Sequence, residues 1–418
     1  WKTVELISDT DEPRPLFQPP GRGARYGSGK PRAAYSTPRP PSQWAAPDFD
    51  DSGWARVRGA FGPGWGASSV WGPGNPAALS AMCVRGTFMV TNPAACDDLQ
   101  IALEYRGGVV VYVNGKELKR QHLPKGEIDL DTLATPYKPP AYLKPVGKLL
   151  HPMYDQKTYA DHIRLYQVRA LEVMIPAGML RKGVNVVAIE IHRAPVREIL
   201  LTGRYHKLYA GRIPGPWPHA GLMKAQVRSM TQRHEEVPHP GCTPNLRRPE
   251  GVQVWNSRIV RRIDKWDYGN PCEPLHDIRI VGARGGSFGG HFAFGCTDPV
   301  EGLRVSVSDL KCPGGTIQAS QVELYYEKQE GDSFAWGFSR RFETLWPTPP
   351  AAIQPELKYG GLVQPIWLKV RVPRGAKPGK YAATLTINYQ KGIRDINLKP
   401  QEPIKVPIAL QVHDWLMP

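Results

Sequence analysis

The strongest secondary-structure signal in the chain is Val109-Val-Val-Tyr-Val-Asn-Gly115, followed by Lys116-Glu-Leu-Lys119. Its first five residues are β-branched or aromatic, which favours an extended strand. Asn114-Gly115 suits a two-residue hairpin turn, because both central positions of that turn need a left-handed backbone. The stretch therefore predicts a β-hairpin whose second strand begins at Lys116.

Alternating apolar and polar residues extend this pattern in both directions along the chain. In the run from Asp98 to Tyr105, for example, the apolar residues fall on one face of a strand. Similar runs lie at 84–90, 169–175, 184–192, 278–281, 302–308, 321–326, 366–372, 381–388 and 404–412. Short strands separated by turns at regular spacing are typical of β-sandwiches. The fold class predicted from this pattern is all-β, with two β-sandwich domains.

The composition supports that prediction by excluding other classes. The chain contains 42 Gly and 43 Pro, about one residue in five, and both are unfavourable inside helices. Helix bundles are therefore excluded, and the absence of a Gly-X-Y period excludes collagen. Hydrophobic residues make up 41% of the chain, with 12 Trp, 17 Tyr and 10 Phe, so a disordered chain is not expected.

Glycine and proline are concentrated in two places, and these divide the sequence into four segments. Residues 1–43 are rich in Pro, Gly and Arg and predict an extended N-terminal arm. Residues 213–275 predict a Pro-rich connector. The strand-rich segments 44–212 and 276–418 are the two predicted sandwiches.

The charge and hydropathy limit the location and the partners. The net charge of +16 is spread along the chain, and its longest basic runs are pairs. This predicts a generally basic surface without a specific nucleic-acid site. No apolar run reaches 18 residues, so no transmembrane helix is expected. The chain begins at Trp1 without a signal peptide, and we expect a mature or excised piece of a secreted, periplasmic or cell-surface protein.

The six cysteines of the chain also indicate its cellular location. No Cys-x-x-Cys pair is present, so the sequence does not support a zinc ribbon or a thioredoxin-like redox site. An even number in a chain rich in Pro and Trp favours disulfides in an oxidising compartment. Pairing between neighbours is the simplest of the 15 connectivities, and the alternative is six buried thiols. The neighbour pairs are Cys83–Cys96, Cys242–Cys272 and Cys296–Cys312.

Three motifs of the first sandwich resemble the galactose-binding-like jelly-roll domains that accompany many secreted glycoside hydrolases. They are Phe49-Asp-Asp-Ser-Gly-Trp54, Tyr112-Val-Asn-Gly115 and Leu180-Arg-Lys-Gly-Val-Asn-Val-Val-Ala-Ile-Glu-Ile191. The resemblance covers residues 44–195. It implies a jelly-roll fold and a role in binding carbohydrate or docking.

Motifs of the second sandwich resemble the immunoglobulin-like β-sandwich that precedes the catalytic barrel of β-N-acetylgalactosaminidase-like glycoside hydrolases. They lie at 282–290, 302–310, 372–387 and 406–418. The family's acidic pair lies in the barrel and has no counterpart in this sequence. The resemblance therefore carries over no catalytic residue, and we expect a non-catalytic chain.

Aromatic residues in glycine-rich loops are candidates for stacking on sugar rings. Trp65 and Trp71 lie in such a loop, and Tyr112 and Asn114 lie at the predicted hairpin. The alternative is that the loop aromatics close the end of the sandwich. No pair of acidic residues forms an obvious catalytic pair.

A structural calcium ion is the one cofactor that the sequence suggests. Asp129 and Asp131 are one residue apart and can share a face, which suits oxygen ligation of calcium. The rest of a calcium-loop pattern is missing, so a chain without cofactor is the alternative.

These observations predict a non-catalytic, secreted carbohydrate-binding or docking accessory chain of a glycoside-hydrolase-like protein. Its partner would be a glycan or another protein subunit. One alternative is a structural extracellular protein that self-assembles into a homo-oligomer through the N-terminal arm or the connector. The other is a non-catalytic fragment of a larger glycoside hydrolase.

Overall fold

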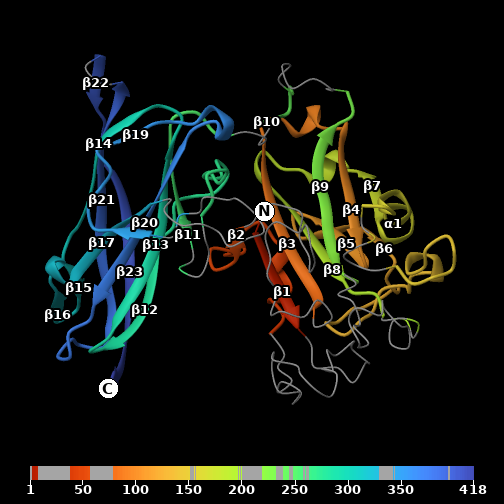
Figure 1. Cartoon of the computed structure of the whole chain (residues 1–418), viewed down its shortest axis with the longest axis horizontal. Helices are drawn as coiled ribbons and strands as arrows, with labels where there is room; N and C mark the ends of the chain where they lie inside the picture. The colour runs from red at the N-terminus through yellow and green to blue at the C-terminus, as the bar shows by residue number, and fades with distance from the viewer. Residues whose placement is uncertain are drawn as a thin grey trace. The chain divides into compact units, whose positions relative to one another are not determined.

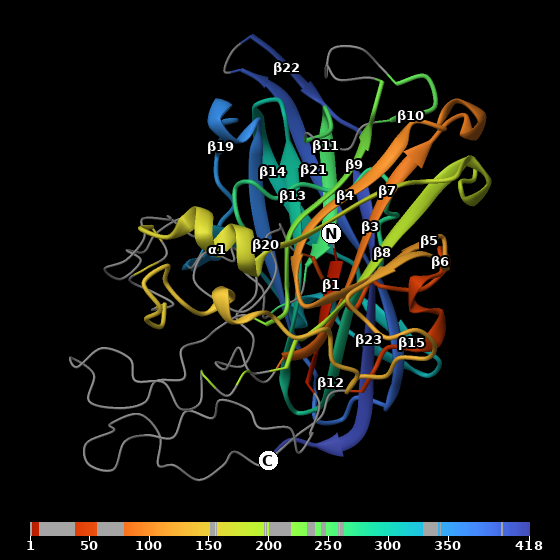
Figure 2. The ribbon, with the colours of Figure 1, turned by 90° about the vertical axis from the view of Figure 1, so that its right-hand side faces the viewer.

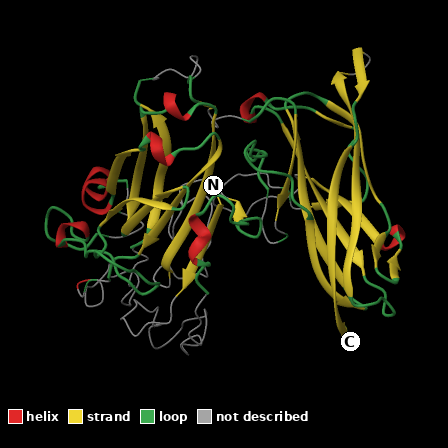
Figure 3. Cartoon of the chain, turned by 180° about the vertical axis from the view of Figure 1, so that it is seen from behind, coloured by secondary structure: helices red, strands yellow, loops and turns green. Residues whose placement is uncertain are grey.

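The computed structural model describes most of the chain. The described residues are 2–7, 38–56, 79–150, 157–195, 219–231, 239–243, 248–257, 263–328, 344–393 and 396–418, together with Asp155, Arg197, Ile199, Ile259 and Phe342. They form two compact units, Trp1–Pro244 (unit 1) and Asn245–Pro418 (unit 2). Each unit is built from β-sheets (Figures 1 and 3), which confirms the predicted fold class.

Unit 1 packs a large sheet against a small one. The large sheet has the strand order β2-β1-β3-β8-β5-β6, with β10 also paired to β3, and the small sheet has the order β7-β4-β9. All these pairs are antiparallel. The bounds are β1 Lys2–Ile7, β2 Ala55–Arg56, β3 Leu79–Val90, β4 Leu99–Arg106, β5 Gly108–Val113, β6 Lys116–Gln121, β7 Arg169–Met174, β8 Gly183–His192, β9 Gly221–Ser229 and β10 Cys242–Thr243.

The predicted hairpin is present at the edge of the large sheet. Asn114 and Gly115 have φ angles of 51° and 83°, and β5 pairs with β6 around them. The predicted apolar face of β4 is also confirmed, because Leu99, Ile101 and Tyr105 are buried with β5 and β8 in one core cluster. The Asn-Gly pair thus predicted the turn, and the alternation of apolar and polar residues predicted the face of β4 that is buried in the core of unit 1.

The breaker-rich segments differ from their prediction as an arm and a connector. Residues 2–7 form β1, which lies between β2 and β3. Residues 221–229 form β9, which pairs with β4, and residues 252–257 form a strand of unit 2. The physical reason is that backbone pairing with a long partner strand stabilises segments whose own composition signals no strand.

The long polar segment between β6 and β7 contains α1 (Ala160–Gln167), the one α-helix among the described residues. Figure 2 shows α1 and the preceding loop to one side of the strands of unit 1. Buried residues such as Tyr142, Leu150 and Ala194 form a small core beneath it. No helix in the described part of the chain has the length and apolarity needed to span a membrane.

Unit 2 is a sandwich of two larger sheets. One sheet has the order β11-β13-β20-β17-β18, and the other has β12-β23-β21-β14-β19 with β15, β16 and β22 attached. β12 and β23 are parallel, and the other pairs are antiparallel. The bounds are β11 Val252–Ser257, β12 Ile278–Arg284, β13 Ser287–Cys296, β14 Val300–Val307, β15 Leu310–Cys312, β16 Gly315–Ile317, β17 Val322–Lys328, β18 Thr344–Trp346, β19 Ala352–Ile353, β20 Leu362–Arg371, β21 Gly379–Ile393, β22 Ile396–Pro400 and β23 Ile404–Leu416.

The glycine-rich segment 282–290 includes the end of β12, a turn at Gly285 and Gly286, and the start of β13, and the two strands belong to different sheets. A Cβ on Gly282 would lie 2.4 Å from the Phe288 ring, so only glycine allows that ring to fold back over the turn. Phe292 and Phe294 of β13 are buried in a core that also contains the buried residues of β20, β21 and β23.

The outer face of the large sheet in unit 1 is also covered. Trp44 stacks on Trp54 at 5.9 Å between ring centroids and meets Tyr112 edge-on at 5.8 Å. The Arg85 side chain, which is almost fully buried, donates to the carbonyl of Ala46 at 3.0 Å and pairs with Asp51 at 2.7 Å. The segment 42–54 is thus fixed to the sheet by aromatic packing and a buried cation.

A buried carboxylate lies on the same outer face. Glu190 of β8 accepts from Arg39 Nη2 at 2.6 Å and from the Tyr112 hydroxyl at 3.3 Å, and it lies 3.0 Å from His192 Nε2. His192 Nδ1 lies 2.9 Å from the carbonyl of Thr132. The His192 ring thus connects Glu190 to the backbone of Thr132.

These partners outweigh the cost of burying the charge. Burial by itself raises the pKa of Glu190, but the hydrogen bond and charge of His192, together with the charge of Arg39, lower the pKa below its ordinary value. A carboxyl whose pKa is lower in the folded state stabilises the fold above its unfolded pKa. That contribution is lost as pH falls through the folded pKa.

We expect Asn185→Ala to destabilise unit 1. The Asn185 amide donates to the carbonyls of Arg181 and Gly183, and its oxygen accepts from Arg181 N and from the Asn114 side chain. Removing these bonds leaves buried polar groups unpaired and lowers the free energy of unfolding by about 2–4 kcal/mol. Urea denaturation measures this loss, and Lys182→Ala, at an exposed turn position, is the control. Equal stability of the two variants would contradict the role of Asn185.

We expect Glu190→Gln to remove part of the acid sensitivity of unit 1. At pH 7 the variant loses about 3–5 kcal/mol, because it leaves Arg39 and His192 without their buried carboxylate. The parent loses its Glu190 contribution between the unfolded pKa of about 4.5 and the lower folded pKa, so the difference in stability between the two proteins shrinks progressively below pH 4.5. Urea unfolding from pH 7 down to about pH 3 tests this, with Glu117→Gln, at a surface ion pair with Arg120, as the matched control. A difference in the free energy of unfolding that stays constant over this range would refute it.

Candidate functional site

Two of the four residues that the sequence nominated for sugar binding, Tyr112 and Asn114, lie in the described part of the chain. Trp65 and Trp71 lie outside the described residues. Asn114 uses its amide within the fold, donating to the carbonyl of Met179 at 2.9 Å and to Asn185 Oδ1 at 2.7 Å. Its side-chain oxygen accepts from Val186 N at 2.9 Å. Both amide hydrogens are therefore committed to holding the hairpin against β8.

Tyr112 is also part of an internal contact. Its ring packs edge-on against Trp44, and its hydroxyl donates to Glu190. Burial and the neighbouring Glu190 carboxylate raise the pKa of Tyr112 well above its ordinary value, so the hydroxyl stays protonated at neutral pH. The side chain covers the outer face of the large sheet.

The two candidate calcium ligands lie in a tight turn. Asp129 Oδ1 accepts from Thr132 Oγ1 at 2.7 Å and from Asp131 N at 3.0 Å. The bond from Thr132 is the largest cause of the lowered pKa of Asp129. Within the described residues, no group of three or more His, Cys, Asp or Glu side chains is arranged to hold a metal ion. The turn accounts for Asp129 without calcium.

All six cysteines lie in the described part of the chain, and no two of them are joined in a disulfide. The predicted neighbour pairing is not formed. Cys83 belongs to the cluster on the outer face of the large sheet, whereas Cys96 belongs to the core on its inner face. Cys242 and Cys272 belong to different units. Cys83, Cys96 and Cys296 are buried, and the other three are half-buried.

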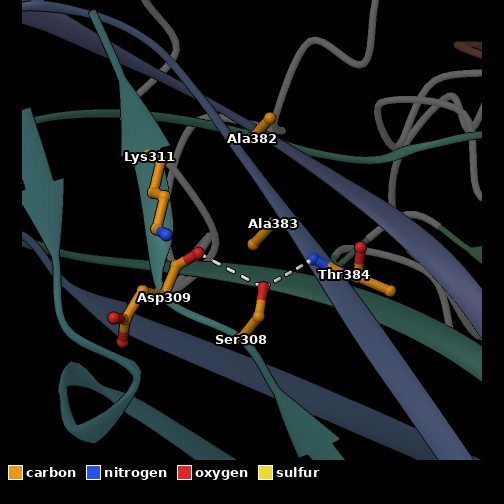
Figure 4. A pocket seen from close by; sticks show the side chains of 6 residues that line it. All are labelled: Ser308, Asp309, Lys311, Ala382, Ala383 and Thr384. Carbon is orange, nitrogen blue, oxygen red and sulfur yellow. Dashed lines mark hydrogen bonds between the residues drawn. The ribbon is translucent and has the colours of Figure 1, made fainter.

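An open depression lies on unit 2, where β14 and β15 meet β21 (Figure 4). Its volume is about 420 Å³, and it is lined by Ser308, Asp309, Lys311, Ala382, Ala383 and Thr384. The Ser308 hydroxyl accepts from Thr384 N at 3.0 Å and donates to the carbonyl of Asp309 at 3.2 Å. The Asp309 carboxylate accepts from Ala319 N at 2.8 Å. These polar groups serve to join the strands, and the lining offers no aromatic ring.

A stronger candidate is a set of exposed and half-buried side chains on two loops of unit 2, which we name the aromatic patch: Lys265, Trp266, Glu356, Leu357 and Tyr359. The rings of Trp266 and Tyr359 meet edge-on, with centroids 4.8 Å apart. Trp266 is 39% exposed and Leu357 is fully exposed. Lys265 Nζ forms an ion pair with Glu356 and lies 5.5 Å from the centroid of the Tyr359 ring. Apolar rings and charged groups therefore occupy one small area.

Local hydrogen bonds hold both loops of the aromatic patch. Asp264 Oδ1 accepts from Trp266 N at 3.0 Å, an Asx turn that fixes the backbone at the tryptophan. Arg248 Nη2 donates to the carbonyl of Lys265 at 2.9 Å. The second loop is a short 3-10 helix, Leu357–Tyr359, that ends at Gly360 in the left-handed conformation. The rings are thus placed on preformed loops.

Sequence reasoning missed the aromatic patch, because it assigned Trp266 to the connector. The signal available was Asp264-Lys-Trp-Asp267, in which aspartates on both sides of a tryptophan indicate a tight turn. Nothing local connects that turn with Tyr359, which is more than ninety positions away. The pairing of β11 with β13, and of β13 with β20, belongs to the tertiary structure.

Comparison with known proteins finds one family model. The glycoside hydrolase 123 N-terminal domain matches residues 282–389. The resemblance expected for the second sandwich is therefore confirmed over that segment. No curated protein matches the chain.

Solved structures show distant likenesses only. A family 123 glycoside hydrolase from Clostridium perfringens, studied for glycolipid glycan hydrolysis, matches 40% of this chain and 28% of its own, with 14% identity and a TM-score of 0.29. A Bifidobacterium dentium β-glucuronidase matches 88% of this chain and 45% of its own, with 9% identity and a TM-score of 0.21. A Bacteroides uniformis β-glucuronidase matches 86% of this chain and 30% of its own, with 11% identity and a TM-score of 0.20. This chain spans less than half the length of each of these proteins.

Proposed function

We propose that this chain is a non-catalytic β-sandwich part of a glycoside-hydrolase-like protein and that it binds carbohydrate on the aromatic patch. The observation that carries the proposal is a preformed pair of rings, the exposed Trp266 and the half-buried Tyr359, next to the Lys265–Glu356 ion pair. The match of residues 282–389 to the N-terminal domain of glycoside hydrolase family 123 supports a carbohydrate context.

The chemistry of the aromatic patch suits a sugar. A sugar ring offers C–H groups on one face and hydroxyl groups at its edge, so its receptor needs an aromatic surface flanked by polar groups. Trp266 and Tyr359 supply aromatic surface, Glu356 supplies an acceptor, and Lys265 supplies a donor. The exposed Lys358, whose Nζ lies 5.5 Å from the centroid of the Tyr359 ring, supplies a further donor.

The finer assignment of unit 1 as a galactose-binding-like jelly roll is part of the same proposal. Its support is the packing of two antiparallel sheets around one core, with the Asn114-Gly115 turn held by Asn185. Since Tyr112 and Asn114 are engaged inside the fold, we place carbohydrate binding on unit 2. Location outside the cytoplasm stays a prediction.

We expect Trp266→Ala to weaken glycan binding about tenfold or more, because it removes the larger ring of the pair. Binding is measured first on an array of glycans that end in galactose, N-acetylgalactosamine or glucuronic acid. Titration calorimetry on the best ligand then gives the affinities of the parent, Trp266→Ala and Tyr359→Ala.

The matched control is Trp415→Ala. Trp415 is 56% exposed and lies on β23 near Met417, which contacts the turn before β13. The aromatic patch adjoins Gly361 near Cys296, at the other end of β13. Loss of binding in Trp266→Ala alone supports the proposal. Equal loss in both variants, or a parent chain that binds no glycan on the array, contradicts it.

A further inference from the structure

Cys96 and Cys242 meet in unit 1, although 146 positions separate them in the sequence. Cys96 follows the 3-10 turn Pro93–Ala95, and Cys242 is the first residue of β10. The two thiols are in hydrogen-bonding contact. Cys96 is fully buried, and Cys242 packs half-buried against the same core cluster.

Backbone contacts bring the two segments together. The carbonyl of Gly241 accepts from Thr91 N at 2.8 Å and from Asn92 N at 3.2 Å, which continues the pairing of Cys242 with Val90. A Cβ on Gly241 would lie 2.4 Å from Cys96 Sγ. The absence of a side chain at position 241 is therefore what lets the chain reach Cys96.

A histidine side chain fixes the same two segments to each other. His239 Nδ1 accepts from Gly241 N at 3.0 Å and from Cys242 N at 3.1 Å. The remaining hydrogen is then on Nε2, which donates to Asp98 Oδ1 at 2.9 Å. Asp98 is two residues from Cys96, so the imidazole bridges the two cysteine-bearing segments.

This group is not a hydrolytic triad. Asp98 Oδ2 accepts from the hydroxyls of Ser229 and Thr231, so the serine is bonded to the carboxylate and not to the imidazole. Burial opposes ionisation of Asp98, but the hydrogen bonds from Ser229, Thr231 and His239 together hold its pKa well below the ordinary value. The nitrogen of His239 that could act as a base is occupied by two backbone donors. The arrangement positions the two thiols.

We propose that Cys96 and Cys242 are a disulfide pair, which oxidation closes and which ties residues 239–243 to the turn between β3 and β4. The oxidant is a low-molecular-weight disulfide. Cys242, the more exposed thiol, loses its proton, and its thiolate attacks the oxidant to form a mixed disulfide and one free thiol. Cys96 then displaces the second thiol. Two S–H bonds are lost, one S–S bond forms in the protein, and the oxidant accepts two electrons and two protons.

The surroundings of the pair make this bond slow to form and to exchange at neutral pH. Burial, the adjacent Cys96 thiol and the Asp98 carboxylate raise the pKa of Cys242 to about 11. Burial, Asp98 and Asp97 likewise raise the pKa of Cys96, and the hydrogen bond with Cys242 only partly offsets them. Only about one thousandth of a thiol with a pKa of 11 is ionised at pH 8. A bond of this kind suits a permanent cross-link better than a fast redox relay.

The cross-link encloses most of unit 1. The chain between Cys96 and Cys242 contains β4 to β9 and α1. Closing so long a loop restricts the unfolded chain strongly, so we expect oxidation to raise the melting temperature of unit 1 by roughly 5–10 °C.

The test uses the full chain, oxidised with glutathione disulfide at pH 8.5 and compared with the chain kept in a phosphine reductant. Peptide mapping without reduction is expected to show a Cys96–Cys242 link, and calorimetry the rise in melting temperature. Cys242→Ser and Cys96→Ser are expected to lose both, whereas Cys312→Ser, a half-buried thiol of unit 2, keeps both. Circular dichroism confirms that each variant is folded. A Cys242–Cys272 link, a folded parent that forms no link, or a rise that persists in Cys242→Ser would overturn the proposal.

Discussion

Strand β8 is buried on both faces from Asn185 to His192, and the organisation of unit 1 follows from this constraint. Its inward residues, such as Ile189 and Ile191, belong to the core between the two sheets. Its outward residues include Glu190 and His192, and a polar group without water must find partners in the protein. Arg39 and the backbone of Thr132 provide them, so loops distant in sequence are anchored to one strand.

One sheet of unit 2 meets the same requirement differently. In β23 the buried positions alternate with exposed or half-buried ones up to Val412, so the outer face of that sheet is open to water. The turns are then free to carry specialised side chains. Rigid strands with variable loops are a common basis for binding sites, and the aromatic patch lies on such loops.

Much of the architecture was predictable because the period of two is a local property of strands. The inward face of β4 and the long strands of the second sandwich, such as β20, follow from it, and the Asn114-Gly115 turn follows from its own local sequence. β1, β9 and β11 were missed because they lie in segments rich in breakers and are stabilised by pairing with longer strands. For such segments, partners distant in sequence decide the structure.

The candidate sites were less predictable for the same reason. Tyr112 and Asn114, which the sequence nominated for sugar binding, make their side-chain hydrogen bonds inside the fold. Trp266 and Tyr359, and likewise Cys96 and Cys242, become neighbours only through tertiary structure. The spacing of residues along the chain does not predict such contacts, because the strands that bring these residues together are distant in sequence.

The parallel pairing of β12 with β23 has a consequence for biosynthesis. More than a hundred residues lie between these strands, and among the described strands only β23 pairs with β12. On the ribosome, β12 emerges several seconds before β23 at about 5–20 residues per second. The sheet that contains β12 therefore cannot be completed until the last strand of the described chain has been synthesised.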